Sequence, residues 1–253
     1  MNLAFVLLRE ARLPRLEQVA SAFAAYASDG HPLLTRPSDT DAPDGEGSLE
    51  FGLAPGETAV VGLMPAPVPG NEAEAAAQFS VLALGTGWSL PPHSAHLVVV
   101  MKGDGDAQTV DGLSRFTSLL AAIVQATQAV GVYWGAAGAT HDGGFFTDLA
   151  REPEIASRIM LWTGVSVARE PGGRLSLLSR GMQQLALPDL LLTARPAQEA
   201  LEVFFKLLTY VAERGQALPE GDTIGRDENE KLTVHYVPSP VNGGAKVWRI
   251  DLE

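Results

Sequence analysis

The sequence contains no cysteine. This absence excludes disulfide bonds, a thiolate nucleophile, and any zinc or iron–sulfur site built on cysteine ligands. A chain of 253 residues is long enough to bury most of its apolar surface without such cross-links. We therefore expect an ordinary packed core to stabilise the protein, and we expect no cofactor.

Long hydrophobic runs are also missing. No apolar stretch approaches the roughly 20 residues that a membrane-spanning helix needs. The opening run Leu3–Leu8 is short, is followed by the charged residues Arg9 and Glu10, and lacks a small-residue cleavage site. It therefore predicts a buried strand rather than a signal peptide. Together these features predict a cytoplasmic protein of a bacterial type that does not bind membranes.

Positive charge is scarce. The chain has 18 lysines and arginines against 30 aspartates and glutamates, which gives a formal net charge of −12. Such a chain repels a phosphate backbone, so nucleic acids and anionic membranes are not expected as partners. The acidic residues concentrate in 39–57 and 220–230, where they would attract a basic protein partner. The alternative is that acidity only keeps the protein in solution.

The first half of the chain alternates short apolar runs with amphipathic segments. Pro14 suits the first turn of a helix, Asn71 suits a helix cap, and the prolines of 65–70 cannot continue a central strand. The pattern predicts a strand over Asn2–Arg9, a helix from Pro14 to Tyr26, a hairpin of Leu49–Leu53 and Thr58–Met64, a helix over Glu72–Leu84, and a strand over His96–Met101.

The strongest helix signal lies in the middle of the chain. A wide apolar stripe runs from Val110 to Val130 and predicts a long helix at the centre of the core. The segments after it predict a strand over Val132–Trp134, a helix over Phe146–Arg151, a hairpin of Ile159–Ala168 and Leu175–Ser179, a helix over Leu201–Val211, and strands over Leu232–Val237 and Lys246–Leu252.

This order of elements predicts an α+β fold made of two tandem ferredoxin-like (βαββαβ) halves joined by the long central helix. We expect residues 1–106 to form the first half, and 107–253 to form the linking helix and the second half, within one compact unit. A methionine, then prolines, then a helix follow the hairpin in both halves, which indicates internal duplication. Because such successions are common, the halves could also be unrelated.

Two histidines precede the strand at 96–101. His93 and His96 lie three residues apart, close to Trp88, and could share a metal ion or contact a ligand. A first-row metal needs at least three protein ligands, and the sequence offers no obvious third. We therefore predict no metal site. The alternative for this pair is one structural histidine and one exposed histidine.

A glycine-rich segment at 135–144 follows the aromatic residues Tyr133 and Trp134. Backbone amides in such a loop can hold an anion, and His141 and Asp142 would add polar contacts. The spacing matches neither the dinucleotide fingerprint nor the P-loop, so a tight structural loop is the alternative. Catalysis by His141 oriented by Asp142 would need a nucleophile, and the chain has no Gly-x-Ser-x-Gly elbow. The sequence therefore predicts no catalytic residue and argues against an enzyme.

Three blocks of the sequence resemble a bacterial domain-of-unknown-function family, family 4261. They are Val132–Trp134, the run Gly181–Leu192, and Tyr210–Gly215 followed by Leu218–Gly225. The resemblance covers most of the chain and carries no established activity or catalytic residue. Some members of that family lie near toxin or type VI secretion genes. The resemblance therefore implies an immunity or accessory role.

These observations lead to two functional hypotheses. The first is a non-enzymatic binding protein, in an immunity or secretion-accessory role, that engages a basic protein partner through an acidic surface. The second is a small-molecule-binding domain or enzyme with a cleft between the two halves, lined by Trp88, Tyr133, Trp134 and His141. A homo-oligomer with a purely structural role is a third possibility, since exposed sheet edges pair readily.

Overall fold

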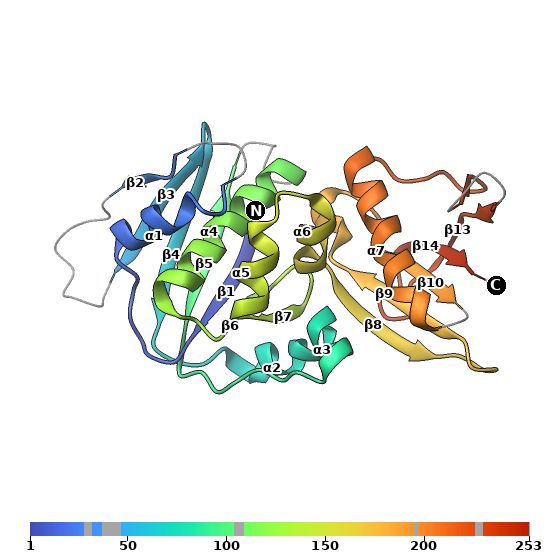
Figure 1. The fold of residues 1–253 in the computed structure, drawn as a ribbon, viewed down its shortest axis with the longest axis horizontal. Helices are drawn as coiled ribbons and strands as arrows, with labels where there is room; N and C mark the ends of the chain where they lie inside the picture. Colours follow the sequence, from blue (N-terminus) through green and yellow to red (C-terminus); the bar gives the residue numbers. More distant parts are fainter. Residues whose placement is uncertain (28–31, 37–46, 104–108, 195–196, 226–229, 253) are drawn as a thin grey trace.

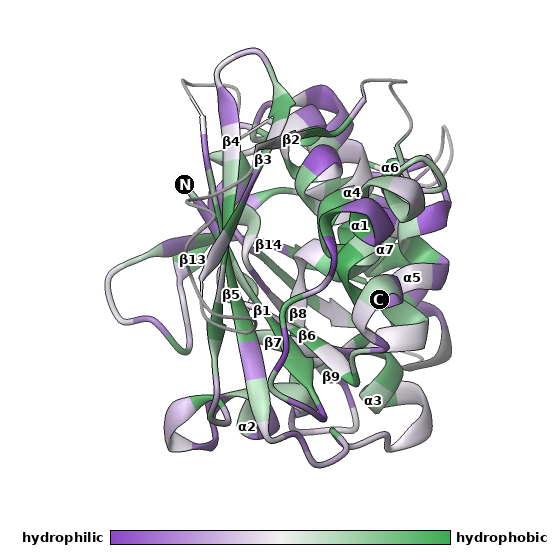
Figure 2. Ribbon diagram, turned by 90° about the vertical axis from the view of Figure 1, so that its left-hand side faces the viewer, coloured by the Kyte–Doolittle hydropathy of each residue, from purple (hydrophilic) through white to green (hydrophobic). Residues whose placement is uncertain are grey.

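The computed structural model describes residues 1–27, 32–36, 47–103, 109–194, 197–225 and 230–252. Within these residues there are seven α-helices, two large sheets and one two-stranded ribbon. The two large sheets lie side by side along the longest axis of the molecule (Figure 1), and the helices α1, α4, α5, α6 and α7 lie on the same side of them (Figure 2). The predicted mixture of helices and sheets is confirmed.

The first sheet is antiparallel throughout and has seven strands. Their spatial order is β2 (Leu34–Arg36), β3 (Ser48–Ala54), β4 (Glu57–Met64), β5 (Ala95–Lys102), β1 (Asn2–Leu8), β6 (Gly131–Trp134) and β7 (Ala139–Asp142). The strands predicted in the first half are therefore confirmed. The strand predicted at Val132–Trp134, however, extends this first sheet instead of opening a second one.

The sheet order differs from the predicted ferredoxin-like order. In a ferredoxin-like unit the first strand separates the third from the fourth, whereas here β5 lies between β4 and β1. The reason is that β4 and β5 are antiparallel neighbours, so the chain between them stays at one end of the sheet and makes no crossover. The helix predicted over Glu72–Leu84 is accordingly two short helices, α2 (Glu72–Ala76) and α3 (Val81–Thr86), at that end (Figure 1).

Three helices cover the inner face of the first sheet. They are α1 (Leu16–Phe23), α4 (Val110–Thr127) and α5 (Gly143–Arg151). The helix α4 begins where the hydroxyl of Thr109 accepts a hydrogen bond from the amide of Gly112. Its residues from Leu113 to Val124 are largely buried, which confirms the predicted central helix.

The second sheet has five strands and a different topology. Their spatial order is β13 (His235–Pro238), β14 (Lys246–Asp251), β10 (Leu190–Ala194), β9 (Leu175–Arg180) and β8 (Gly164–Arg169). The pair β10 and β14 is parallel, because the helix α7 (Ala197–Arg214) lies between them in the chain as a crossover. A ribbon of β11 (Thr223–Ile224) and β12 (Leu232–Thr233) precedes β13. One sheet is antiparallel and the other mixed, so the strand pairings do not repeat between the halves.

The predicted hairpin of Ile159–Ala168 and Leu175–Ser179 is confirmed for its second part, where β8 pairs antiparallel with β9, but its first strand begins later than predicted. The apolar run Ile159–Ala168 contains the end of a helix, α6 (Ile155–Trp162), followed by β8. The helix α6 buries Ile159, Leu161 and Trp162 in the core. A run of consecutive apolar residues can therefore belong to a buried helix as well as to a buried strand.

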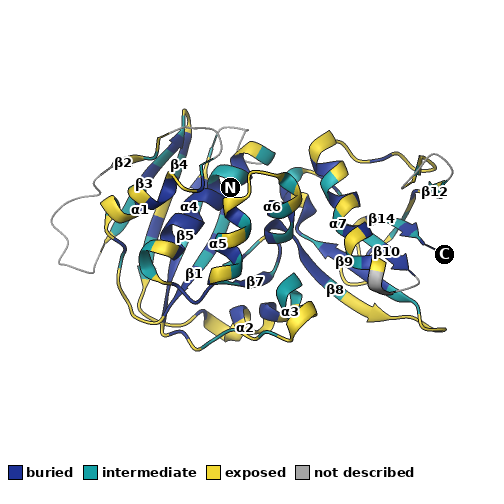
Figure 3. Cartoon of the chain, in the orientation of Figure 1, coloured by how far each residue is buried: buried dark blue, intermediate teal, exposed yellow. Residues whose placement is uncertain are grey.

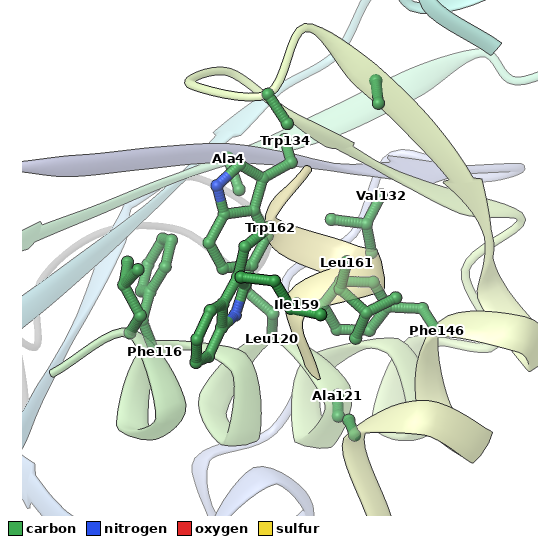
Figure 4. Packing of buried hydrophobic residues seen from close by; sticks show 14 of the residues in the cluster. Ala4, Phe116, Leu120, Ala121, Val132, Trp134, Phe146, Ile159, Leu161 and Trp162 are labelled. Carbon is green, nitrogen blue, oxygen red and sulfur yellow. The ribbon is translucent and has the colours of Figure 1, made fainter. Parts of the chain in front are cut away.

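The core is continuous from one sheet to the other. Its centre lies where α4, α5 and α6 meet the first sheet, around Trp134 and Trp162 (Figure 4). The indole of Trp162 donates a hydrogen bond of 2.8 Å to the hydroxyl of Thr117, and Phe116 packs edge-on against Trp134 with ring centres 5.4 Å apart. The middle of both sheets is buried, whereas the outer turns of the helices and the far end of β8 are exposed (Figure 3). Within the described part of the chain, none of the helices combines the length and the apolar content that crossing a bilayer requires.

Candidate functional site

A cleft of about 530 Å³ lies at the junction of the two sheets. One wall is the turn between β6 and β7, with Gly135 and Gly138; the other wall is the loop Ser239–Lys246 between β13 and β14. The end of β9 and the segment leading into β10 lie between these walls. We call this feature the junction cleft. Its volume is in the range of small-molecule sites.

Glycines allow the turn of the first sheet to approach the second sheet closely. A Cβ atom on Gly164 would lie 2.5 Å from the carbonyl oxygen of Ala137, and one on Gly181 would lie 2.7 Å from the carbonyl oxygen of Trp162. The φ angle of Gly181 is +116°, which side chains other than hydrogen rarely allow. The junction cleft is therefore built on backbone contacts that require glycine.

Asp189 lies on the floor of the junction cleft. Its Oδ1 atom accepts hydrogen bonds from the hydroxyl of Ser179 at 2.9 Å and from the amide of Met182 at 3.1 Å. Burial raises the pKa of the Asp189 carboxyl, although these hydrogen bonds and the charge of Arg180 act in the opposite direction. Asp189 thus takes up a proton more readily than an exposed aspartate does.

Two cationic side chains line the same cleft. The guanidinium of Arg180 lies over the ring of Phe79, 4.5 Å from its centre, and this contact holds the side chain in place. Lys246 begins β14 and is exposed. Among the described residues neither of them is paired with a carboxylate within ion-pair distance. The charge of Arg180 still acts on Asp189 and that of Lys246 on the carboxylate of Glu220, but neither side chain is held in a close ion pair.

A second candidate surface lies between α6 and α7, with α3 at one end. This groove of about 580 Å³ is mostly apolar, and its walls include Met160 from α6 and Leu201, Phe205 and Tyr210 from α7. We call it the helix groove. Lys206 and Glu202 at its edge pair with each other at 2.6 Å, and the carboxylate of Glu213 also borders it.

The structure places His141 inside the core rather than in a cleft. It is fully buried; its Nε2 lies 3.1 Å from the carbonyl oxygen of Leu161, and its Nδ1 lies 3.1 Å from the hydroxyl of Ser80. Because a carbonyl only accepts, Nε2 carries the proton and Nδ1 accepts from Ser80. Burial lowers the pKa of His141 to about 4. In this environment the ring is a neutral link between β7, α6 and the segment before α3.

The neighbours of His141 in the predicted loop have other contacts. Asp142 caps α5, because its Oδ1 accepts hydrogen bonds from the amides of Gly144 and Phe145. Trp134 is fully buried and donates a hydrogen bond of 2.9 Å to the side chain of Gln184. The glycine-rich segment, for which an anion-binding loop and a tight structural loop were the two interpretations, is a strand hairpin followed by a capped helix.

Tyr133 and the two other predicted histidines gather on the outer face of the first sheet. Tyr133 stacks on Phe5 with ring centres 5.6 Å apart, and His96 meets the same ring edge-on at 5.4 Å. His93 is also buried; its Nε2 accepts from the amide of Val68, and its Nδ1 lies 3.6 Å from the carboxylate of Glu74. Burial lowers the pKa of His96 despite a hydrogen bond to the backbone of Ala66.

The predicted site residues are therefore not brought to one place. Tyr133 and Trp134 are consecutive residues of β6 and point to opposite faces of the sheet. Trp88 is half-buried in the segment between α3 and β5. Ligand binding by these residues stays a prediction. Within the described residues, no three histidine, aspartate or glutamate side chains are arranged to hold a metal ion.

Sequence reasoning missed Arg180 and Asp189 as site residues. Both flank the turn that begins at Gly181, and the block Gly181–Leu192 was noticed only for its family resemblance. A signal was present in the sequence: a lone arginine and a lone aspartate border an otherwise uncharged stretch between two buried strands. Charged residues next to buried strand ends are candidates for binding.

Comparison with known proteins matches part of the chain to a family model. Residues 178–251 match a family model described as a domain of unknown function (DUF4261). The matched region runs from β9 to β14 and includes the floor and one wall of the junction cleft. No match to the chain was found among curated proteins or among solved structures. The family resemblance expected from the sequence is thus confirmed for residues 178–251, which match the domain-of-unknown-function family 4261.

Proposed function

We propose that this chain is a binding protein that engages a basic protein partner through the helix groove, in the role of an immunity or secretion-accessory protein. The observation that carries the proposal is the helix groove itself, an apolar surface left open on a molecule with a net charge of −12. An open apolar groove bordered by carboxylates is the kind of surface that binds another protein.

The occupant that fits this groove is an amphipathic helix of the partner. Leu201 and Phe205 lie one helical turn apart on α7, and both are half-buried at the edge of the core. Met160 faces them from α6, and Tyr210 is 42% exposed at the far end. A third helix with apolar side chains at matching spacing would cover this strip.

The carboxylates beside the groove indicate which charge the partner helix carries. Glu202 is already paired with Lys206, whereas Glu213 makes no ion pair with another described residue. A lysine or arginine beside the apolar anchors of the partner would pair with Glu213. The negative charge of the whole molecule would also raise the association rate with a basic partner.

The test uses the product of the gene adjacent to this one. We expect the two purified proteins to bind, with an affinity that falls as salt is added. We expect growth inhibition by that product to be relieved when this chain is co-expressed. The double substitution M160D/F205D, which places two charges in the helix groove, is expected to weaken binding by about tenfold or more in a calorimetric titration.

The control for a charge on an apolar surface is Val60→Asp, because Val60 is an exposed apolar residue on β4, away from the groove. It is expected to bind as the unchanged protein does. Since Met160 and Phe205 are half-buried, circular dichroism of M160D/F205D must also show the fold of the unchanged protein. Equal binding by M160D/F205D and the control would contradict the assignment to the helix groove. No association with the adjacent gene product would contradict the immunity role.

A second candidate function is the binding of a small molecule between the two sheets. A different observation favours it: the junction cleft gathers Arg180, Lys246 and Asp189 from the second sheet against the β6–β7 turn of the first. Thermal stabilisation of the protein by a small compound, lost on substitution in the cleft, would support this function.

A further inference from the structure

We infer that the junction cleft binds a small compound with an oxyanion head, carboxylate or phosphate, and an apolar body, and that Arg180 and Lys246 hold the head. The inference rests on the second candidate function and is independent of the helix groove.

The first step of the argument is the position of Arg180. Arg180 is half-buried beside Gly138, and the contact with Phe79 restrains the guanidinium. A guanidinium whose orientation is already restrained loses little conformational entropy when it binds, and its parallel N–H groups match the two oxygens of a carboxylate or phosphate.

The second step is the balance of charge inside the cleft. The protein as a whole carries a net charge of −12, so an anion would be repelled from most of its surface. The cleft lining differs, because it holds Arg180 and Lys246 against one carboxyl, Asp189. Asp189 also has its Oδ1 occupied by Ser179 and Met182, and burial raises its pKa. The lining therefore presents local positive charge to a ligand.

The third step is the remainder of the lining. Leu178, Leu187 and Val247 give apolar surface, and Asn242 and Ser239 lie in the loop on the open side. The backbone of Gly135 and Gly138 faces them from the first sheet. A compound with an anionic head against Arg180 would therefore rest an apolar body on these side chains.

The test uses three simple probes: benzoate, phenyl phosphate, and benzamide as a neutral analogue of benzoate. Binding is followed by amide chemical shifts in NMR spectra of the full chain. We expect benzoate and phenyl phosphate to shift amides of Gly135, Gly138 and residues of 239–246. Benzamide is expected to bind more weakly than benzoate by at least about tenfold, since it lacks the charge-assisted hydrogen bonds.

Two variants assign the role of each cation. Arg180→Met keeps an unbranched apolar stem and removes the charge and the N–H donors, and it is expected to weaken benzoate binding by about tenfold or more. Because Arg180 also packs on Phe79, the exposed Lys246→Met provides a second variant that spares the core, and a smaller loss is expected. The control is Arg169→Met, an exposed arginine at the end of β8 outside the cleft.

The outcomes distinguish the oxyanion inference from the broader proposal that the junction cleft binds a small molecule. Equal binding of benzamide and benzoate in the cleft would overturn the oxyanion inference and leave small-molecule binding standing. Unchanged benzoate affinity in both Arg180→Met and Lys246→Met would also overturn the inference. No amide shift in the cleft with any probe would overturn both the inference and the second candidate function.

Discussion

His141 has no contact with solvent, and both nitrogens of its ring are used in hydrogen bonds. The neutral ring fits this site, whereas a protonated ring would place a charge in the core and lose its acceptor for Ser80. The low pKa of His141, about 4 against an ordinary 6.5, follows from burial. A histidine predicted as a ligand contact is therefore an acid-sensitive part of the core.

This environment predicts a pH dependence of stability. Because the pKa of His141 is lower in the folded state, its contribution is complete above pH 6.5 and is lost as the pH falls towards about 4. The loss amounts to about 3 kcal/mol of the free energy of unfolding. His141→Gln cannot titrate, so denaturant unfolding at several pH values is expected to give a shallower pH dependence for this variant.

The control for this prediction is His235→Gln, because His235 is exposed and its carboxylate neighbour Glu220 is exposed as well. It is expected to keep the pH dependence of the unchanged protein. Identical pH dependence in His141→Gln and the unchanged protein would refute the buried neutral histidine. So would an NMR titration in which the ring resonances of His141 shift between pH 7 and pH 6.

At the scale of residues, the sequence shows which side chains could bind a ligand but not whether each one is buried or exposed. Trp134 and His141 were predicted to line a cleft, and both are fully buried. Burial depends on whether α6 packs over the sheet, and that depends on tertiary contacts that lie far apart in the sequence. The features that make Arg180 a candidate, its ring contact with Phe79 and its place at a junction, join residues about 100 positions apart.

At the scale of elements, the junction depends on how closely the β6–β7 turn approaches β8. The carbonyl oxygen of Ala137 lies where a side chain on Gly164 would be, and no flexible side chain is present there to move aside. The backbone of Gly164 therefore lies directly against the backbone of Ala137. Extra volume can then be accommodated only if the two sheets move apart.

Gly164→Ala is therefore expected to lower the free energy of unfolding by about 1–3 kcal/mol, as overpacking does in other cores. The measurement is denaturant unfolding followed by circular dichroism. Gly85→Ala is the matched control, because Gly85 lies in α3 with open space around its Cβ position. It is expected to leave stability unchanged or to raise it by up to about 1 kcal/mol. Equal stability of both variants would mean that the junction is looser than described.

Elements were predictable where pattern and length agree. The central helix α4 and the strands β1, β4 and β5 follow directly from apolar periodicity. The order of the strands did not follow, because an alternation of elements is compatible with several pairings. The strand predicted over Ile159–Ala168 is correct only from Gly164 onward, because an apolar segment of that length fits a buried helix and a buried strand equally well.

At the scale of the whole molecule, one set of buried side chains runs through both sheets. Leu97 on β5 and Leu192 on β10 are fully buried members of the same set. The helix α6 packs against α4 and α5 on one side and against α7 on the other. The region matched by the family model, residues 178–251, is therefore packed against residues that precede it, including β8, which pairs with β9.

This continuity predicts a single cooperative unfolding transition for the whole chain. Leu97→Ala and Leu192→Ala each remove buried methyl groups and are expected to cost about 2–5 kcal/mol. If the sheets unfold together, each variant shifts the same transition, and tryptophan fluorescence and far-UV circular dichroism give coincident midpoints. If the sheets unfold separately, each substitution moves only part of the signal and the curve becomes biphasic. A biphasic curve would show that the two sheets are separate folding units and that the junction cleft lies between domains able to move apart.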